Sequence, residues 1–219
     1  MPKLILPPRS FITRTNPEDA IEFYYRPLIG KLYQKKTQDV LNMLPDKLGR
    51  VLEIGYGSGI IIPTLYSHLE EYYGIDLHNK IKEVRQFLKR MNMDKRNIHL
   101  SKRSILNPGF KRNLFDTVLS ISVFEHLKPE YLNRAFLNIK KILKPGGILV
   151  SSFPTKNIFL ETAFRLMRFD PDEHHPSSPG DILSGLQEHF TIERLEKFPS
   201  CLPMDLGLYV TARHRRKRS

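Results

Sequence analysis

Short apolar runs alternate with longer segments of helical periodicity along most of the chain. The short runs are rich in β-branched and aromatic residues, whereas apolar residues in the segments between them recur every three to four positions. This alternation is typical of βαβ units around a mostly parallel sheet. The expected strands are 50–55, 72–76, 97–100, 115–122 and 147–153, and the expected helices between them are 59–70, 80–91 and 130–143.

The carboxy-terminal third departs from this alternation. An apolar helical stretch is expected over 157–169, followed by a polar, proline-broken loop over 170–180 and a helix over 181–188. Strand-like runs then follow at 190–198 and 206–212, with no helix between them. Because strands joined without a crossover helix pair antiparallel, these two are predicted to form a hairpin that closes the sheet.

The patterns predict one domain with two helical additions. The domain is expected over 1–212, and a basic tail over 213–219. Within the domain, 1–48 would form a helical amino-terminal approach or lid, and 154–189 a helical cap insertion.

Composition places the chain among soluble globular proteins. Of its 219 residues, 40% are hydrophobic and 26% are charged, which is enough for a buried core. Cys201 is the only cysteine, which excludes a disulfide-built scaffold and a cysteine-rich zinc cluster and fits a reducing compartment. Residues 1–8 are too poor in apolar side chains for a signal-peptide core, and no segment approaches the roughly 20 apolar residues of a membrane span. We therefore expect a cytoplasmic protein, at most peripheral to a membrane.

The net charge is +12, from 35 basic and 23 acidic residues. The tail contains five of the positive charges in the run RHRRKR over 213–218, so the rest of the chain carries +7. Such an excess indicates anionic partners without fixing the fold or the activity. Two interpretations stay open for the tail: a solvated terminus, or a patch that contacts an anionic membrane or a nucleic acid.

The most informative motif is a glycine-rich turn after the first expected strand. Gly55, Gly57 and Gly59 lie between a strand and a helix, where they permit a tight turn and close approach of the backbone to a ligand. The dinucleotide pattern GxGxxG would need a glycine where Ile60 stands. Glu53, two residues before the first glycine, would repel a diphosphate and favours a ligand that carries positive charge.

A second acidic residue stands at the tip of the second expected strand. Asp76 follows Gly55 by 21 residues, which is the spacing of one βα unit in nucleoside-binding sheets. Its carboxylate can accept two hydrogen bonds from the 2′- and 3′-hydroxyls of a ribose. The glycine turn and Asp76 are therefore consistent with one ligand that is both cationic and nucleoside-like.

These motifs, together with two later ones, resemble those of class I S-adenosylmethionine-dependent methyltransferases, of the small single-domain type seen in ubiquinone and menaquinone biosynthesis. The later motifs are FDxVLS with VFEHL within 115–127, and LKPGG over 143–147. The resemblance covers about residues 24–213. It implies an α/β fold with a Rossmann-like, doubly wound, seven-stranded, mostly parallel sheet in the order 3-2-1-4-5-7-6, whose last strand is antiparallel.

The resemblance also implies the cofactor, S-adenosylmethionine, and the residues that would hold it. The methionine part would lie against the glycine turn and the end of the fourth strand, the ribose against Asp76 and the adenine against Leu77. The family usually has an acid after the third strand that contacts the adenine amino group. Ser104 stands at that place, and its hydroxyl can accept the same hydrogen bond more weakly. The implied cofactor-binding residues are Glu53, Gly55, Gly57, Gly59, Asp76, Leu77, Ser104, Ser120 and Ser122.

Histidines provide two further candidates. His126 is the candidate catalytic residue, because an imidazole can act as a base near neutral pH, although capping of the following helix also explains it. The segment DEHH over 172–175 resembles a metal or base cluster, but adjacent residues of this kind do not define a coordination geometry. We interpret it as a solvated loop and predict no metal site.

The predicted function is methyl transfer to an O, N or C nucleophile of a small-molecule, lipid-like or glycan-linked acceptor. Apolar residues within 159–167 and aromatic residues within 23–33 would flank the acceptor. RNA or protein methylation is the alternative that the net charge suggests, although the fourth strand is followed by no Asn-Pro-Pro-Tyr-type motif. A non-catalytic cofactor-binding protein is a third interpretation, which the intact Glu53 and Asp76 disfavour.

Overall fold

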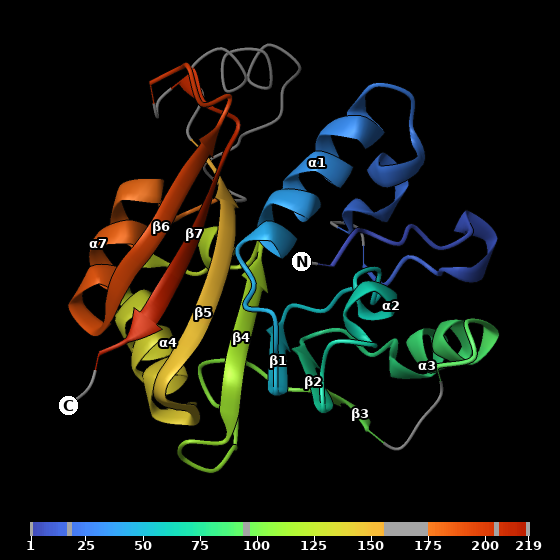
Figure 1. Cartoon of the computed structure of the whole chain (residues 1–219), viewed down its shortest axis with the longest axis horizontal. Coiled ribbons are helices and arrows are strands. Elements are labelled where there is room, and N and C mark those ends of the chain that lie inside the picture. Colours follow the sequence, from blue (N-terminus) through green and yellow to red (C-terminus); the bar gives the residue numbers. More distant parts are fainter. Residues whose placement is uncertain (1, 17–18, 94–96, 156–174, 204–205, 218–219) are drawn as a thin grey trace.

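A seven-stranded sheet forms the centre of the molecule, and helices cover both of its faces (Figure 1). The computed structural model describes residues 2–16, 19–93, 97–155, 175–203 and 206–217. The strands are β1 (Arg50–Ile54), β2 (Glu71–Asp76), β3 (Ile98–Lys102), β4 (Phe115–Ile121), β5 (Leu143–Pro154), β6 (Phe190–Phe198) and β7 (Tyr209–Arg216).

The strand order confirms the predicted topology. The sheet runs β3-β2-β1-β4-β5-β7-β6. Neighbouring strands from β3 to β5 are parallel, whereas β7 is antiparallel to both β5 and β6. The chain proceeds outward from β1 through β2 to β3 and then returns to place β4 on the other side of β1. This reversal opens a crevice at the carboxyl ends of β1 and β4, the usual place for a ligand in an open α/β sheet.

Each face of the sheet has its own hydrophobic core. The helices are α1 (Ile29–Asn42), α2 (Ile62–Leu65), α3 (Ile81–Arg90), α4 (Pro129–Ile142) and α7 (Pro179–His189), with short 3-10 turns η1 (Arg9–Phe11), η2 (Ala20–Tyr25) and η3 (Phe124–His126). Because successive strand residues point to opposite faces, Val51 belongs to the core with α1, α2 and α3, whereas its neighbour Leu52 belongs to the core with α4 and α7.

The helix expected over 59–70 is much shorter than predicted. Only α2 is α-helical, and turns precede and follow it. The carbonyl of His68 accepts a hydrogen bond from the backbone N–H of Leu48 at 3.3 Å. This contact holds residue 68 near the start of β1, so a helix does not continue to residue 70. The contact is long-range, and the local periodicity of the sequence does not predict it.

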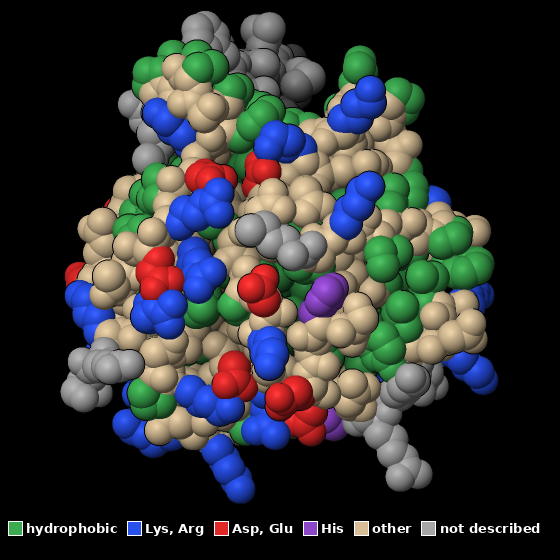
Figure 2. Space-filling view, in the orientation of Figure 1, with side chains coloured by type: hydrophobic (Ala, Val, Ile, Leu, Met, Phe, Trp, Pro, Cys, Tyr) green, Lys and Arg blue, Asp and Glu red, His purple; other side chains and the backbone are tan. Residues whose placement is uncertain are grey.

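Residues 213–216 of the basic segment lie in a strand and not in a solvated tail. The first four residues of the predicted tail 213–219 belong to β7, so that prediction is wrong for them. The side chain of His214 is buried on one face of the sheet, whereas Arg213 and Arg215 both form ion pairs with Glu193 of β6. Basic and acidic side chains accordingly interleave on this side of the surface (Figure 2). Successive side chains of a strand point to opposite faces, so some of these residues form ion pairs and others are buried. The number of charges in the sequence does not show this difference.

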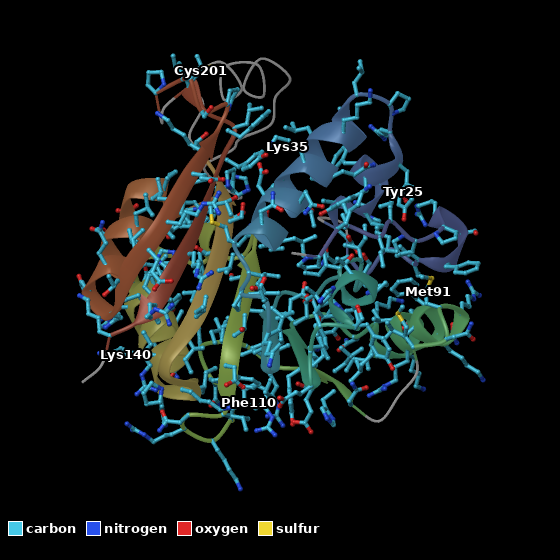
Figure 3. All side chains as sticks on the ribbon, viewed as in Figure 1. Tyr25, Lys35, Met91, Phe110, Lys140 and Cys201 are labelled. Atoms are coloured by element: carbon cyan, nitrogen blue, oxygen red, sulfur yellow. The ribbon has the colours of Figure 1, made fainter. Side chains whose placement is uncertain are left out.

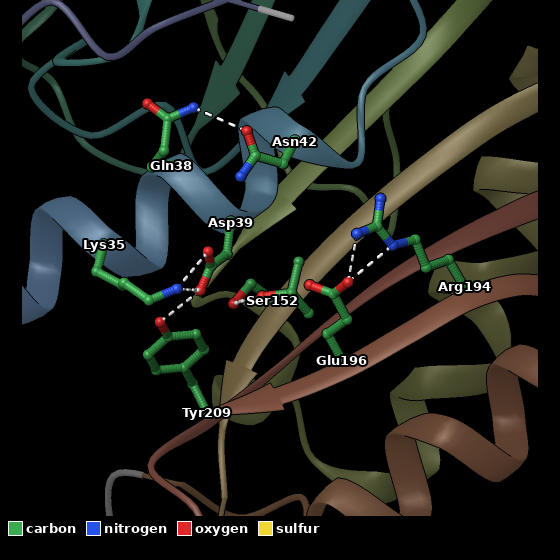
Figure 4. Close-up of polar contacts among 9 residues, drawn as sticks. Lys35, Gln38, Asp39, Asn42, Ser152, Arg194, Glu196 and Tyr209 are labelled. Carbon is green, nitrogen blue, oxygen red and sulfur yellow. Dashed lines mark hydrogen bonds and ion pairs between the residues drawn. The ribbon is translucent and has the colours of Figure 1, made fainter. Parts of the chain in front are cut away.

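Polar contacts fasten α1 to the beginning of β7 (Figure 4). The hydroxyl of Tyr209 donates to Asp39 Oδ2 at 2.8 Å, and Lys35 Nζ donates to the same carboxylate at 2.7 Å. The helix is thereby held at the mouth of the crevice, where Tyr33 and Lys36 reach its wall. The amino-terminal segment 1–48 thus contributes to the site described below.

The carboxy-terminal helix begins on a well-formed cap. Ser178 Oγ accepts a hydrogen bond from the backbone N–H of Asp181 at 3.2 Å, and the Asp181 carboxylate accepts one from the backbone N–H of Ser178 at 2.9 Å. This reciprocal arrangement fixes the start of α7. Most of the predicted cap insertion 154–189 lies outside the described residues, including the apolar helix expected over 157–169.

The position of the cysteine and the length of the helices can be compared with what the composition predicted. Cys201 is exposed in the turn between β6 and β7 (Figure 3). Within the described ranges, no helix combines the length and the apolar character needed to cross a membrane.

His214 gives the stability of this fold a pH dependence. Burial lowers the pKa of its imidazole to about 4, below the 6.5 of an exposed histidine. Protons therefore bind more tightly to the unfolded chain, and the stability that depends on this group is lost as pH falls from 6.5 towards 4, by up to roughly 3 kcal/mol. We expect urea unfolding to show a weaker pH dependence over this range in His214→Gln than in the parent. The exposed His68→Gln is the control and should retain the parent's pH dependence.

Candidate active site

A cavity of about 630 Å³ lies at the carboxyl ends of β1, β2 and β4. Its volume is within the usual range of small-molecule sites. The glycine turn after β1 and the ends of β2 and β4 form its base, while η2 and α1 contribute a wall. The predicted site residues on its lining are Glu53, Gly55, Gly57, Asp76, Leu77, Ser104, Ser122 and His126.

Two of the predicted cofactor contacts lie away from this lining. Ser120 is 1% exposed in β4, and among the described residues its hydroxyl has no hydrogen-bond partner. Gly59 lies under α3, where a Cβ would stand 2.9 Å from Val84 Cγ1. Gly59 therefore serves close packing of the chain, and the positions of both residues give no support to direct contact with a ligand.

The glycine turn presents bare backbone to the cavity. Gly57 has φ +50°, and no atom of the described chain lies within 4 Å of the place where its Cβ would stand. Gly55 has φ +74°, and a Cβ there would collide with Val123 in the segment after β4. A side chain at Gly55 would push the turn off its neighbour, and one at Gly57 would fill the space open to a ligand.

Backbone N–H groups hold the Asp76 carboxylate at the tip of β2. Its Oδ2 accepts from Gly57 N at 2.8 Å, and its Oδ1 accepts from Leu77 N at 2.6 Å and more weakly from His78 N at 3.3 Å. Oδ2 accepts only one of these bonds, so a lone pair remains for a hydroxyl from the cavity. The carboxylate is thus oriented before any ligand arrives.

Glu53 is an unusual acid, because it lies at the base of the cavity and is only 4% exposed. The pKa of its carboxyl is raised to about 8, chiefly by burial and to a smaller extent by the nearby charge of Asp76. The hydroxyl of Tyr72 donates to Glu53 Oε2, which opposes the rise in the pKa. The carboxyl therefore ionises reluctantly in the free protein, and a cation beside it would favour the ionised form.

Lys36 belongs to the site, although sequence reasoning missed it. Its ammonium donates to the Oγ of Ser122, a residue that has φ +53° directly after β4. A non-glycine residue with this backbone conformation is strained, and such strain concentrates at functional sites. Burial lowers the pKa of Lys36, and the charge of Glu125 opposes this. No local signal marks Lys36, because its partner is 86 residues away.

His126 lies at the cavity rim beside two other groups able to bind protons or metal ions. Its ring is 5.1 Å from that of His175, which is half-buried rather than in a solvated loop. Glu125 is buried just before it, and this burial raises the pKa of the carboxyl. The other residues of the segment 172–175 lie outside the described residues. The fold thus places His175 beside His126, although the two residues are far apart in the sequence. The segment DEHH by itself did not predict this pairing.

Aromatic residues within 23–33 were predicted to flank the acceptor, and two of them form part of the cavity wall. Tyr24 and Tyr33 line the cavity, and the Tyr24 hydroxyl is buried against Thr37. Phe23 stacks on Tyr33, with ring centroids 5.3 Å apart. Tyr25 is directed away towards the amino-terminal segment (Figure 3), where its hydroxyl donates to a backbone carbonyl. One wall of the cavity is therefore formed by a segment that precedes the first strand of the sheet.

A methyltransferase domain is found in the chain by comparison with known families, over residues 52–151. The matched range begins in β1 and ends in β5, so it contains the glycine turn, Asp76 and His126. Over 105 residues the chain is 32% identical to a probable non-canonical nonribosomal peptide synthetase, CymA, of Salinispora arenicola (strain CNS-205). That match covers 47% of this chain and 1% of the synthetase, so the chain corresponds to a very small part of that protein.

Solved structures share the fold over nearly the whole chain. The PH0226 protein of Pyrococcus horikoshii OT3 superposes with a TM-score of 0.69 at 20% identity, covering 88% of this chain and 93% of that one. The N-methyltransferase NodS of Bradyrhizobium japonicum WM9, in complex with S-adenosyl-L-homocysteine, gives a TM-score of 0.64 at 20% identity and covers 93% and 94% of the two chains. At these identities the likeness establishes the fold.

Proposed function

We propose that the chain is a class I S-adenosylmethionine-dependent methyltransferase, and that it methylates a small-molecule, lipid-like or glycan-linked acceptor through an O, N or C nucleophile. This proposal rests on the cavity at the carboxyl ends of β1 and β4, where the strand order reverses. Acidic groups lie at the base of this cavity, and η2 and α1 form one of its walls. Donor and acceptor would share this cavity.

The residues at the base of the cavity fit the cofactor. S-adenosylmethionine supplies an activated methyl group on a sulfonium, and it also carries an ammonium and a ribose diol. We assign the ribose to Asp76, the positively charged methionine end to Glu53 and the glycine turn, and the adenine to the exposed Leu77 and to Ser104. Ser104 Oγ already accepts from Leu106 N at 3.1 Å, so its contribution to adenine recognition would be the smaller one.

The acceptor would lie between the end of β4 and the amino-terminal helices. Ser122, Lys36 and His126 supply polar groups there, and Tyr24 and Tyr33 supply apolar surface. The main contribution of the protein would be to align the nucleophile with the methyl group and to exclude water, effects worth about 7–11 kcal/mol in favourable cases. We assign His126 to the acceptor and not to the cofactor.

The size of the cavity favours a small acceptor, or one chain end, over a folded polymer. A volume of about 630 Å³ must hold the cofactor as well as the reacting group. The basic residues that suggested RNA are partly engaged within the fold, because Arg213 and Arg215 bind Glu193 and Arg216 donates to the backbone of Leu143. NodS, one of the proteins that share this fold, is an N-methyltransferase, which is compatible with an amine among the acceptors considered.

Transfer of a labelled methyl group tests the proposed function. The protein would be incubated with methyl-labelled S-adenosylmethionine and with separate lipid, polar small-molecule, RNA and protein fractions of a cell extract. We expect label in the lipid or small-molecule fraction and none with Asp76→Ala, which lacks the group assigned to the ribose. Glu71→Gln, whose carboxylate pairs with Arg50 outside the cavity, is the matched control and should retain the activity of the parent. Label only in RNA or protein would replace the proposed acceptor class.

A further inference from the structure

Three groups that commonly bind metal ions converge beside the acceptor end of the cavity. Glu125 and His126 belong to η3, directly after β4, and His175 comes from the segment that leads into α7. One carboxylate oxygen of Glu125 and one ring nitrogen of each histidine all lie within 4.8 Å of one another. His126 also lines the cavity, so the cluster opens towards the proposed acceptor.

Glu125 has an oxygen that its surroundings leave without a partner. The residue is 2% exposed, and in the described part of the chain its Oε2 accepts no hydrogen bond. A buried carboxylate oxygen without a donor is costly, and native structures usually explain such a group by an ion, a water or a functional role. A cation between this carboxylate and the two imidazoles would satisfy it.

The two chain segments of the cluster are held together by a neighbour that is not itself a ligand. The backbone N–H of Ser177 donates to the carbonyl of Glu125 at 3.3 Å, and its hydroxyl donates to the carbonyl of Leu127. The capped start of α7 follows at once, with Ser178 as the N-cap. These contacts of Ser177 position His175 against η3, so that the three groups are held together before any cation binds.

We propose that Glu125, His126 and His175 bind a divalent transition-metal cation at the acceptor end of the cavity. Two imidazoles and one carboxylate suit Zn²⁺, Mn²⁺ or Fe²⁺, whereas Mg²⁺ and Ca²⁺ prefer oxygen ligands only. This assignment replaces the sequence-based prediction of no metal site. That prediction considered only neighbours within 172–175, whereas two of the three ligands lie near residue 125.

The cation would also narrow the acceptor class, an inference that rests on the proposed function. Three protein ligands leave at least one coordination position for a further donor atom. Because a bound cation lowers the pKa of a coordinated hydroxyl, an acceptor with a hydroxyl group would gain most from such a site. The proton would pass to solvent as the hydroxyl binds.

Calorimetric titration of the metal-free full chain tests the site without any need for activity. Zn²⁺ and Mn²⁺ would be titrated separately, with Mg²⁺ as the comparison. We expect one equivalent of Zn²⁺ or Mn²⁺ per chain and an affinity at least tenfold lower in His126→Ala, in His175→Ala and in the isosteric Glu125→Gln. His68→Ala, which removes an exposed histidine outside the cluster, should bind like the parent.

Thermal unfolding keeps the test informative if a variant is less stable. The cation should raise the unfolding temperature of the parent and of His68→Ala but not that of the three cluster variants. No stoichiometric binding, or equal binding in all variants, would overturn the proposal. Titration of the same samples with S-adenosyl-L-homocysteine separates the two assignments: loss of metal binding alone rejects the cation site, whereas failure of the parent to bind this product rejects the proposed function.

Discussion

Asp76→Ala is expected to lose binding of S-adenosylmethionine by on the order of a hundredfold or more, because hydrogen bonds to a charged group contribute about 1.5–3 kcal/mol each. The substitution removes the proposed acceptor for the ribose. It also removes the partner of the Gly57 N–H, which the Asp76 carboxylate now binds at 2.8 Å. The loss should therefore combine weaker ligand contact with a less ordered glycine turn. Isothermal titration with S-adenosylmethionine and with S-adenosyl-L-homocysteine measures it.

Asp76→Asn separates these two effects. The amide oxygen can still accept from Gly57 N, whereas the negative charge and one acceptor oxygen are lost. We expect an affinity between those of the parent and Asp76→Ala, with an unfolding temperature close to that of the parent. Binding by Asp76→Ala within threefold of the parent would show that this residue does not hold the ribose.

Affinity for S-adenosylmethionine is expected to rise with pH until the Glu53 carboxyl is ionised in the free protein. Its pKa is raised to about 8, so below this pH a cationic ligand must displace a proton on binding. The dissociation constant should then fall about tenfold per pH unit up to 8 and level off above it. Titrations at pH 6.5, 7.5 and 8.5 measure this directly. An affinity that is constant over this range would contradict the assignment of the ligand's positive charge to Glu53.

Glu53→Gln is expected to remove the pH dependence and to weaken binding at pH 8.5 by about 1.5–3 kcal/mol. The amide oxygen can still accept from Tyr72, and loss of ionisation should not harm the fold. Because the folded-state pKa lies above the unfolded value of 4.5, ionisation of Glu53 opposes folding, and the stability it provides when protonated is lost as pH rises from 4.5 to 8. Glu53→Gln should therefore be at least as stable as the parent at pH 8.5. A large loss of stability would make its weak binding a folding defect.

The acidic, glycine-rich base of the cavity could be predicted from sequence because its residues are close along the chain. Glu53, Gly55 and Gly57 belong to one strand and turn, and Asp76 ends the strand that pairs with it. In a parallel sheet, neighbouring strands place their carboxyl ends at one edge, so spacing alone brings these groups together. Ser120 shows the limit of this reasoning, because one residue of shift along β4 decides between the cavity wall and the buried interior.

The end of the cavity that we assign to the acceptor could largely not be predicted from sequence. His126 was recognised through its motif, but Lys36 reaches Ser122 across 86 residues. His175 meets His126 only because Ser177 ties its segment to η3. Neither pairing leaves a mark in local composition or periodicity, since each depends on how helices pack over the ends of the strands.

The sequence by itself determined the layered α/β fold, the strand order through its family motifs, and the acidic and glycine residues that meet at the base of the cavity. Burial periodicity and turn residues act over a few positions, so they remain legible in a linear chain. Only the tertiary structure decided the environment of the charged groups. Arg213 and Arg215 form ion pairs within the sheet, and His214 is buried. Glu125 lies beside two histidines. The environment of a charge is set by desolvation and by partners that are distant in sequence, and folding alone brings these together.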